Sequence, residues 1–259
     1  MRYLIPLLAF LLIGCDGENS NVAPSKDSPE ETASGTKPPE AVSVNPNLKY
    51  GIKGDAVTIT GCDKKASGEL IIAAKIEGKP VTKIGEGAFE DCTSLTNITI
   101  PDSVTFIAQK TFSGCNNLTS ITIPNSINRI CHSTFWNCSN LTSVTIPDGV
   151  TNIGTDAFRG CTSLTSITIP DSFTTIYDRA FRDCTGLTSI TIPDSVKFIN
   201  GNAFYGCSSL TSVTFLGDAP NIRDNAFQDS SPTIYRKADA KGWGDTFAGR
   251  PVKLITEKP

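Results

Sequence analysis

The sequence predicts an α/β-type repeat solenoid, mostly β, with short strands joined by short helical or irregular segments on the convex side. Three observations lead to this fold class: cysteine, phenylalanine and leucine each recur every 23 residues in one common phase. Units of this size cannot close a core alone, so a shared period across apolar columns indicates that they stack. The period relates Cys92, Cys115, Cys138, Cys161, Cys184 and Cys207; Phe89, Phe112, Phe135, Phe158, Phe181, Phe204 and Phe227; and Leu95, Leu118, Leu141, Leu164, Leu187 and Leu210.

One unit, residues 187–209, reads LTSITIPDSVKFINGNAFYGCSS. Leu187, Ile190 and Ile192 are apolar and polar residues alternate with the isoleucines, which predicts a short strand. Pro193 cannot donate a backbone hydrogen bond, so it ends the strand, and the Asp-Ser pair after it makes the turn. The valine and isoleucine that follow are expected to point inward, and the AF–GC segment is expected to form the returning side.

The rest of the chain divides around the repeats, which occupy residues 84–229. Residues 47–83 are expected to form an N-terminal cap with the leading strand, and residues 230–259 a C-terminal cap. Residues 15–46 contain no aromatic residue and are rich in Pro, Ser, Glu and Gly. Such a segment cannot bury enough surface to offset its ordering entropy, so we expect a disordered tether. Residues 1–14 are expected to be a signal peptide.

This leader begins with Arg2 and continues with an apolar run, residues 3–13, that is too short to span a bilayer as a helix. The run ends in the motif LIGC at Cys15, which resembles the lipobox of bacterial lipoproteins. The resemblance implies cleavage before Cys15 and acylation of that cysteine, for example with palmitate. The alternative is an ordinary signal peptide followed by an incidental cysteine. We expect lipidation and a place in the cell envelope, at the outer membrane or cell surface, because several acyl chains anchor a protein stably.

The repeat also carries a family resemblance. The pattern LxxIxIPxxVxxIxxxAFxxC resembles the BspA-like class of leucine-rich repeats, which occur in bacterial surface proteins. The resemblance covers residues 84–229 strongly and residues 68–85 and 233–249 more weakly. Local departures are the Leu-Gly pair at 216–217, in place of Pro-Asp, and Cys131, where the next repeat has glycine. The resemblance implies surface display and adhesion to host or neighbouring-cell molecules, without fixing a ligand.

The charge balance argues against nucleic-acid binding. The chain has 23 basic and 26 acidic residues; three basic and six acidic ones lie within 1–46, so residues 47–259 hold 20 of each. A nucleic-acid binder needs a basic face that displaces counterions from phosphates. We therefore expect no nucleic-acid partner.

Nine cysteines in an exported chain would ordinarily suggest disulfides. Cys15 is assigned to lipid and six belong to the repeat column, whereas Cys62 and Cys131 have no assignment. Stacked equivalents have parallel side chains about one strand spacing apart, but a disulfide needs converging Cβ atoms ~3.5–4.5 Å apart. We expect the six column cysteines to be buried thiols that act as small hydrophobic residues.

Little in the sequence supports catalysis. His132 is the only histidine and, with Cys131 and Cys138, could form a metal site or a thiol with its base. Cys138 belongs to the core column, however, and the other two residues lie on a variable turn. The motifs of common hydrolases, nucleotide binders and zinc sites do not occur. We expect no enzyme activity, no metal and no other cofactor.

A row of residues after the strand-ending prolines offers a second metal hypothesis. Stacked carboxylates could bind calcium, but turn chemistry by itself explains Asp and Asn there, and we favour the turn. The row comprises Asp102, Asn125, Asp148, Asp171 and Asp194.

Ligand recognition is expected from residues that vary between repeats. The exposed strand positions are uniform threonine columns, 96–211 and 99–214, which could dock glycans or extended peptides, although Thr also simply favours strands. Aromatic and Arg side chains are the usual interface anchors. Trp136 follows the core residue Phe135, so we expect it to point outward. The variable residues are Phe106, Lys110, Phe198 and the set expected to bind ligand, namely Arg129, Trp136, Arg159, Tyr177, Arg182 and Tyr205.

Three function classes remain open. The favoured one is a binding or adhesion module for an extracellular or envelope protein or glycan, attached to the membrane through its lipid. The second is a structural or self-associating envelope protein. The third, ice binding, is suggested by the threonine columns but requires a flat face, whereas we expect a curved one.

Overall fold

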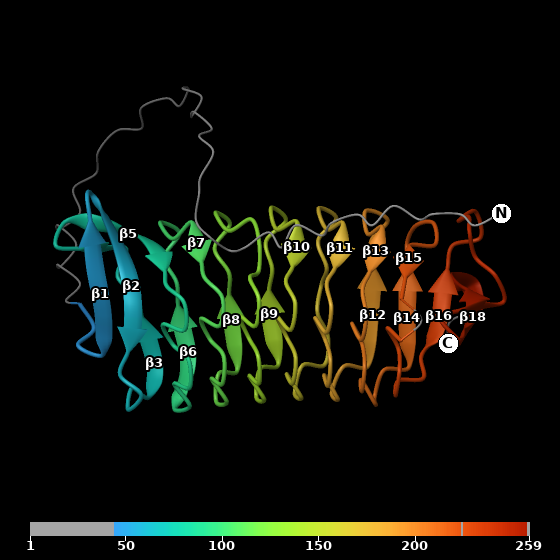
Figure 1. The fold of residues 1–259 in the computed structure, drawn as a ribbon, viewed down its shortest axis with the longest axis horizontal. Helices are drawn as coiled ribbons and strands as arrows, with labels where there is room; N and C mark the ends of the chain where they lie inside the picture. Colours follow the sequence, from blue (N-terminus) through green and yellow to red (C-terminus); the bar gives the residue numbers. More distant parts are fainter. Residues whose placement is uncertain (1–43, 224, 258–259) are drawn as a thin grey trace, which may run out of the picture. The chain divides into compact units, whose positions relative to one another are not determined.

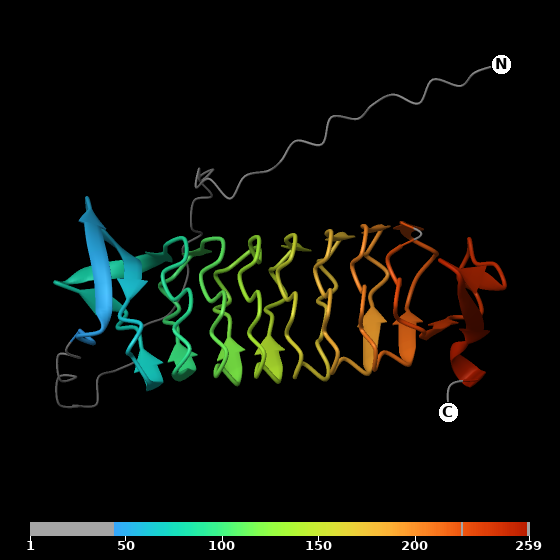
Figure 2. The same cartoon turned by 60° about the horizontal axis from the view of Figure 1, so that its bottom comes forward.

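The computed structural model describes residues 44–223 and 225–257. Cys15, the leader and most of the predicted tether lie outside the described residues. The described chain is a stack of turns, and two rows of short strands run along it (Figure 1). In the turned view of Figure 2 the turns again follow one another along the long axis. The predicted repeat solenoid is confirmed.

The first row contains the strands predicted ahead of Pro101, Pro124, Pro147 and Pro193, whereas ahead of Pro170 only an isolated bridge at Thr168 forms. The strands of this row are β3 (Gly68–Ile71), β6 (Leu95–Thr99), β8 (Ser120–Thr122), β9 (Ser143–Thr145), β12 (Ser189–Ile192), β14 (Ser212–Phe215), β16 (Thr233–Arg236), β17 (Thr246–Phe247) and β18 (Arg250–Leu254). Pairing from β3 through β6 and β8 to β9 is parallel, with Ser120 opposite Ser143, one period away. A second sheet has the order β12-β14-β16-β18-β17. In the turn between the two sheets, Thr168 forms an isolated parallel bridge with Thr191 of β12.

The second row consists of two-residue strands that the sequence pattern does not predict. They are β7 (Phe106–Ile107), β10 (Asn152–Ile153), β11 (Thr175–Ile176), β13 (Phe198–Ile199) and β15 (Asn221–Ile222). Ile176 pairs with Ile199 of the next turn, and both are buried, as expected for inward-pointing residues. Each turn therefore contributes backbone hydrogen bonds on two sides of the core.

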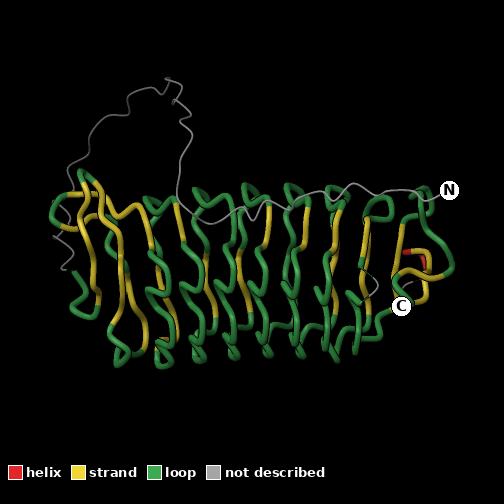
Figure 3. Tube along the Cα trace, in the orientation of Figure 1, coloured by secondary structure: helices red, strands yellow, loops and turns green. Residues whose placement is uncertain are grey.

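Of the two forms expected for the convex segments, helical or irregular, the structure shows mainly the irregular one. The only helix in residues 44–223 and 225–257 is η1 (Ile255–Glu257), a 3-10 turn, and Figure 3 shows loops between the strands. Two residues per turn, such as Asp156 (φ 55°) and Gly160 (φ 74°), adopt a left-handed conformation that an α-helix cannot contain. The amides here also donate to the next turn, as from Phe158 N–H to the Ala180 oxygen over 2.8 Å. The returning side is thus irregular, which is one of the two forms expected for it.

The N-terminal end of the stack is closed by strands outside the period. β1 (Leu48–Lys53) pairs antiparallel with β2 (Ala56–Cys62), and β2 runs parallel to β5 (Lys79–Ile84). The short β4 (Lys75–Ile76) pairs antiparallel with β5. A terminal turn needs such a cap because its apolar stacking face would otherwise meet water.

An aromatic cluster closes the C-terminal end. The rings of Phe215, Trp243 and Phe247 have centroids 4.7–5.5 Å apart. The indole N–H of Trp243 also donates to the Gly217 oxygen over 3.3 Å. The Leu-Gly pair that departs from the repeat pattern therefore lies where the cap begins.

Phenylalanine rings form a central column of the core. All seven column members from Phe89 to Phe227 are buried, with consecutive centroids 5.2–5.6 Å apart. Stacked aromatic pairs contribute about 0.5–1.5 kcal/mol each beyond their area burial. Because each ring stacks on rings of adjacent turns, stability arises between neighbours.

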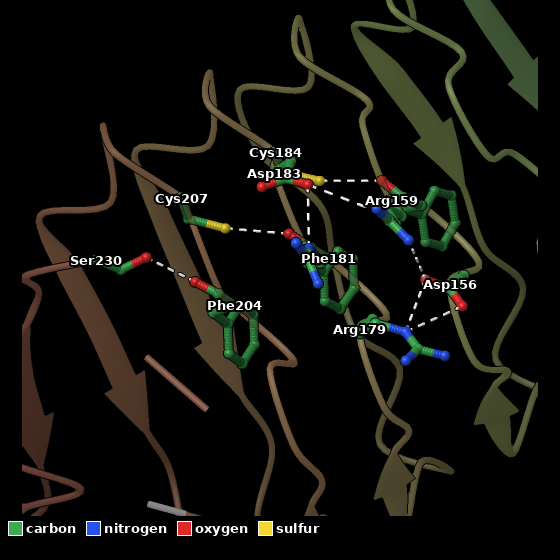
Figure 4. A network of polar contacts seen from close by, with 11 residues as sticks. Asp156, Arg159, Arg179, Phe181, Asp183, Cys184, Phe204, Cys207 and Ser230 are labelled. Carbon is green, nitrogen blue, oxygen red and sulfur yellow. Dashed lines mark hydrogen bonds and ion pairs between the residues drawn. The ribbon is translucent and has the colours of Figure 1, made fainter. Parts of the chain in front are cut away.

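The cysteine column adds buried polar contacts. From Cys115 to Cys207, each thiol donates to the oxygen of the phenylalanine 26 residues earlier over 3.0–3.2 Å. Ser230 takes the cysteine position in the last turn, and its hydroxyl donates to the Phe204 oxygen over 2.6 Å (Figure 4). All six column cysteines are free and buried, which confirms the expectation of core thiols. Burial raises the pKa of Cys115 and of Cys207 to about 12.

Candidate binding surface

Four of the six residues predicted to bind ligand share one position of the repeat. Trp136, Arg159, Arg182 and Tyr205 each follow a core phenylalanine, so they come from four consecutive turns. The phenylalanine spacings between these turns are 5.2, 5.6 and 5.5 Å, which gives a length of about 16 Å. We call these four residues the 136–205 column.

Trp136 marks the beginning of the column. It is 38% exposed, which confirms that it points outward. One turn earlier, Ser113 occupies the same position and is buried at 1% exposure. One turn after Tyr205, the position holds an exposed glutamine, Gln228. Large side chains thus occupy this position in four adjacent turns and are flanked by smaller polar residues.

Ion pairs hold the two arginines of the column, and those of Arg159 with Asp156 and Asp183 are drawn in Figure 4. Arg159 lies 3.4 Å from the Asp156 carboxylate in its own turn and 3.8 Å from the Asp183 carboxylate in the next. Arg182 lies 3.2 Å from the same Asp183 carboxylate. Arg179 approaches Asp156 to 3.0 Å. Each carboxylate therefore joins two guanidinium groups, and most of the local positive charge is balanced.

Three members of this network are missing from the predicted set. They are Asp156, Arg179 and Asp183. The spacing contains a partial indication, because Asp156 precedes Arg159 by three residues and Arg179 by one period. Asp156 is 7% exposed, so its charge needs the two guanidinium partners.

The far end of the column is also ordered by contacts. The Arg182 guanidinium carbon lies 4.5 Å from the Tyr205 ring centroid, a cation–π arrangement. A hydrogen bond to Asp229 raises the pKa of the Tyr205 phenol. The contact with Arg182 therefore positions the Tyr205 ring in advance of any ligand.

The remaining two predicted residues lie elsewhere. Arg129 precedes the second-row bridge residue Ile130, and its guanidinium carbon lies 5.5 Å from the Phe106 ring centroid. Tyr177 directly follows β11 and is half-buried. The structure does not bring either residue into the 136–205 column.

The threonine columns differ in their roles. In the first column, hydroxyls donate to the threonine backbone oxygen one turn earlier, as from Thr142 to Thr119 over 3.0 Å and from Thr211 to Thr188 over 3.1 Å. These hydroxyls therefore support the stack. The second column is exposed from Thr99 onward, except that its last member, Thr214, is buried.

His132 is held by neighbouring polar groups. Its Nδ1 lies 2.8 Å from the Thr155 oxygen, and its Nε2 lies 3.1 Å from the Ser133 hydroxyl. The Cys138 thiol donates instead to the Phe112 oxygen over 3.0 Å. The histidine and this cysteine therefore do not form a thiol–base pair.

Residues 44–223 and 225–257 contain no group of three His, Cys, Asp or Glu side chains able to hold a metal ion. In the turn row, Asp194 is paired with Lys197 over 3.4 Å. None of the helices described there is long and apolar enough to cross a bilayer.

Comparison with known proteins identifies the repeat. Six copies of the BspA type leucine rich repeat region match residues 71–188 and 131–236, which together exceed half of the chain. A solved leucine-rich repeat protein from T. pallidum is 32% identical, and the match covers 68% of this chain and 87% of that chain with a TM-score of 0.61. A leucine-rich repeat protein from Bacteroides ovatus, 22% identical over 83% of this chain and 76% of that chain, has a TM-score of 0.51 and supports the fold alone. No curated protein matches the sequence. The chain belongs to the BspA-type leucine-rich repeat family.

Proposed function

We propose that this protein is a non-enzymatic binding module of the cell envelope whose extracellular ligand, a protein or glycan, docks along the 136–205 column. One observation carries the proposal: four large variable side chains from consecutive turns stand at one repeat position, whereas the threonine columns hardly vary. Aromatic and Arg side chains supply most of the binding energy in typical interfaces.

The ion pairs around the column favour such a role. Immobilising a flexible side chain on binding costs about 0.5–1.5 kcal/mol. Asp156 and Asp183 already restrain Arg159 and Arg182 in the folded protein. Binding a ligand therefore removes less side-chain freedom from these arginines and costs less free energy. The balanced charges favour a ligand that offers hydrogen-bonding groups over a strongly charged polymer.

Attachment to the membrane is proposed through acylated Cys15, with the segment up to residue 46 as a tether. A flexible chain of about 31 residues has an r.m.s. span of roughly 30 Å. That length would keep the binding surface clear of the lipid headgroups.

Binding of the full chain to purified matrix proteins and neutral oligosaccharides tests the docking site. For a probe that binds, Trp136→Ala should weaken affinity by roughly 30-fold, about 2 kcal/mol, while the melting temperature stays nearly constant. Phe198→Ala is the matched control, since Phe198 is an aromatic residue, 49% exposed, that lies outside the column.

Two results would contradict the proposal. One is an equal loss of affinity in both variants, and the other is a Trp136→Ala protein that melts early yet binds normally. Sedimentation of the full chain as concentration-dependent oligomers, with every probe unbound, would favour the structural, self-associating alternative instead.

A further inference from the structure

The cysteine column begins differently from the way it continues. Parallel pairing of β2 with β5 and of β3 with β6 lays residues 60–67 against residues 85–94. Cys62 lies in the first segment and Cys92, the first column member, in the second. Cys62 precedes Cys92 by 30 residues and not by 23, so its position is set by the cap and not by the repeat register.

The two thiols are neighbours. Both are free, and Cys62 is 7% exposed whereas Cys92 is fully buried. The Cys62 thiol donates to the Asp63 oxygen over 3.6 Å, and its interaction with the Cys92 thiol raises the pKa of Cys62 and lowers the pKa of Cys92. In the next turn the thiol of Cys115 donates instead to the Phe89 oxygen over 3.1 Å.

We infer that Cys62 and Cys92 form a disulfide that fastens the N-terminal cap to the first repeat. Within the repeats, the stacked phenylalanine rings of adjacent turns have centroids 5.2–5.6 Å apart and nearly parallel planes, whereas a disulfide needs Cβ atoms about 3.5–4.5 Å apart and converging. Cys62 is free of that restriction because the cap segment reaches Cys92 from outside the register. The inference goes beyond the proposed binding function and does not depend on it.

The oxidant is a disulfide, either of a small molecule such as oxidised glutathione or of an oxidoreductase. One of the two protein sulfurs, as its thiolate, attacks one sulfur of that disulfide, forming a mixed disulfide and releasing the first thiolate. The other protein sulfur then attacks the protein sulfur of the mixed disulfide and releases the second thiolate. The two protons from Cys62 and Cys92 pass to the released thiolates, so two protein thiols are oxidised and one external disulfide is reduced.

The bond would stabilise the end of the solenoid. Terminal turns have only one stacking neighbour, so a stack opens most easily from its ends. Closing a loop of this length lowers the entropy of the unfolded chain, and the melting temperature should rise by roughly 5–10 °C.

Peptide mapping of the full chain after treatment with oxidised glutathione tests the inference. Trypsin places Cys62 in peptide 54–64 and Cys92 in peptide 84–110, whereas Cys115 falls in peptide 111–129. A linked pair of the first two peptides, lighter by two hydrogens than their sum, is expected. Recovery of both peptides only in alkylated form, or linkage of peptide 54–64 to another cysteine, would overturn the inference.

Thermal unfolding gives a second readout. Oxidation should raise the melting temperature of the wild-type chain and of the control Cys115→Ser, but not that of Cys62→Ser. An equal rise in all three proteins would also count against the inference. The peptide map uses the unaltered chain, so the test stands even if a variant folds poorly.

Discussion

Asn137 and Gly160 show at the residue scale how consecutive turns interlock. They share one repeat position, both with left-handed backbone, with φ of 55° and 74°. The Asn137 amide oxygen lies so close to the position that a β-carbon of Gly160 would take that the two atoms would clash. Asp183 and Gly206 are related in the same way, because a carboxylate oxygen of Asp183 lies 2.6 Å from the position that a β-carbon of Gly206 would take.

Gly160→Ala should therefore destabilise the fold. The left-handed conformation costs about 1–2 kcal/mol for a residue with a β-carbon, and the contact with Asn137 adds to it, for a total of about 2–3 kcal/mol in urea unfolding. Adding Asn137→Gly to the Gly160→Ala protein should remove the contact. It should then restore only the part of the unfolding free energy that the contact had cost. Gly149→Ala is the control, because the nearest atom to its added carbon would be 3.8 Å away. Equal stability of the Gly160→Ala and Gly149→Ala proteins would refute this account.

The same scale explains what could be predicted of the candidate site. The outward direction of Trp136 follows from its place after Phe135, because adjacent residues there leave opposite sides of the chain. The pairing of Arg159 with Asp183 could not be read from the sequence, since it depends on side-chain conformations across a turn boundary. Sequence spacing thus predicts membership of the column but not its ion pairs.

At the scale of elements, the thiol column makes stability sensitive to alkali. Burial raises the folded-state pKa of Cys115 and Cys207 from an ordinary value near 9.0 to about 12. Between these values the unfolded chain loses thiol protons that the folded chain keeps, so unfolding becomes easier as pH rises. Stability should be unaffected by these thiols below about pH 8 and should fall above pH 9 by about 1.4 kcal/mol per pH unit for each of them.

Chemical denaturation across pH 7–11 checks this expectation. A Cys115→Ser/Cys207→Ser double variant is the comparison, because Ser230 already performs the same hydrogen bond in the last turn. Its stability should fall less steeply above pH 9. Parallel curves for the variant and the wild type would show that these thiols do not cause the alkaline loss.

Elements with a strong local pattern could be predicted and the others could not. The strand ending at Pro193 follows from polar–apolar alternation and from the missing amide of proline. The two-residue strands of the second row, such as β13, are too short to show a period. The returning side was expected to be helical or irregular; the choice could not be made from the sequence, because its hydrogen bonds run between turns and no pattern within one turn reveals them.

At the scale of the whole molecule, Cys15 is expected to determine where the binding surface is held. If this cysteine is acylated, Cys15→Ser should move the protein from the membrane fraction to unprocessed or soluble forms, because each methylene of a lost acyl chain removes ~0.8 kcal/mol of membrane affinity. Residues 44–223 and 225–257 contain no membrane-spanning helix that could substitute for the lipid. Cys62→Ser serves as the control and should stay with the membrane, since Cys62 belongs to the folded cap. Cell fractionation, together with the mobility of the protein on a gel, tests this expectation. An unchanged membrane fraction and unchanged mobility for Cys15→Ser would mean that the LIGC motif does not direct lipidation.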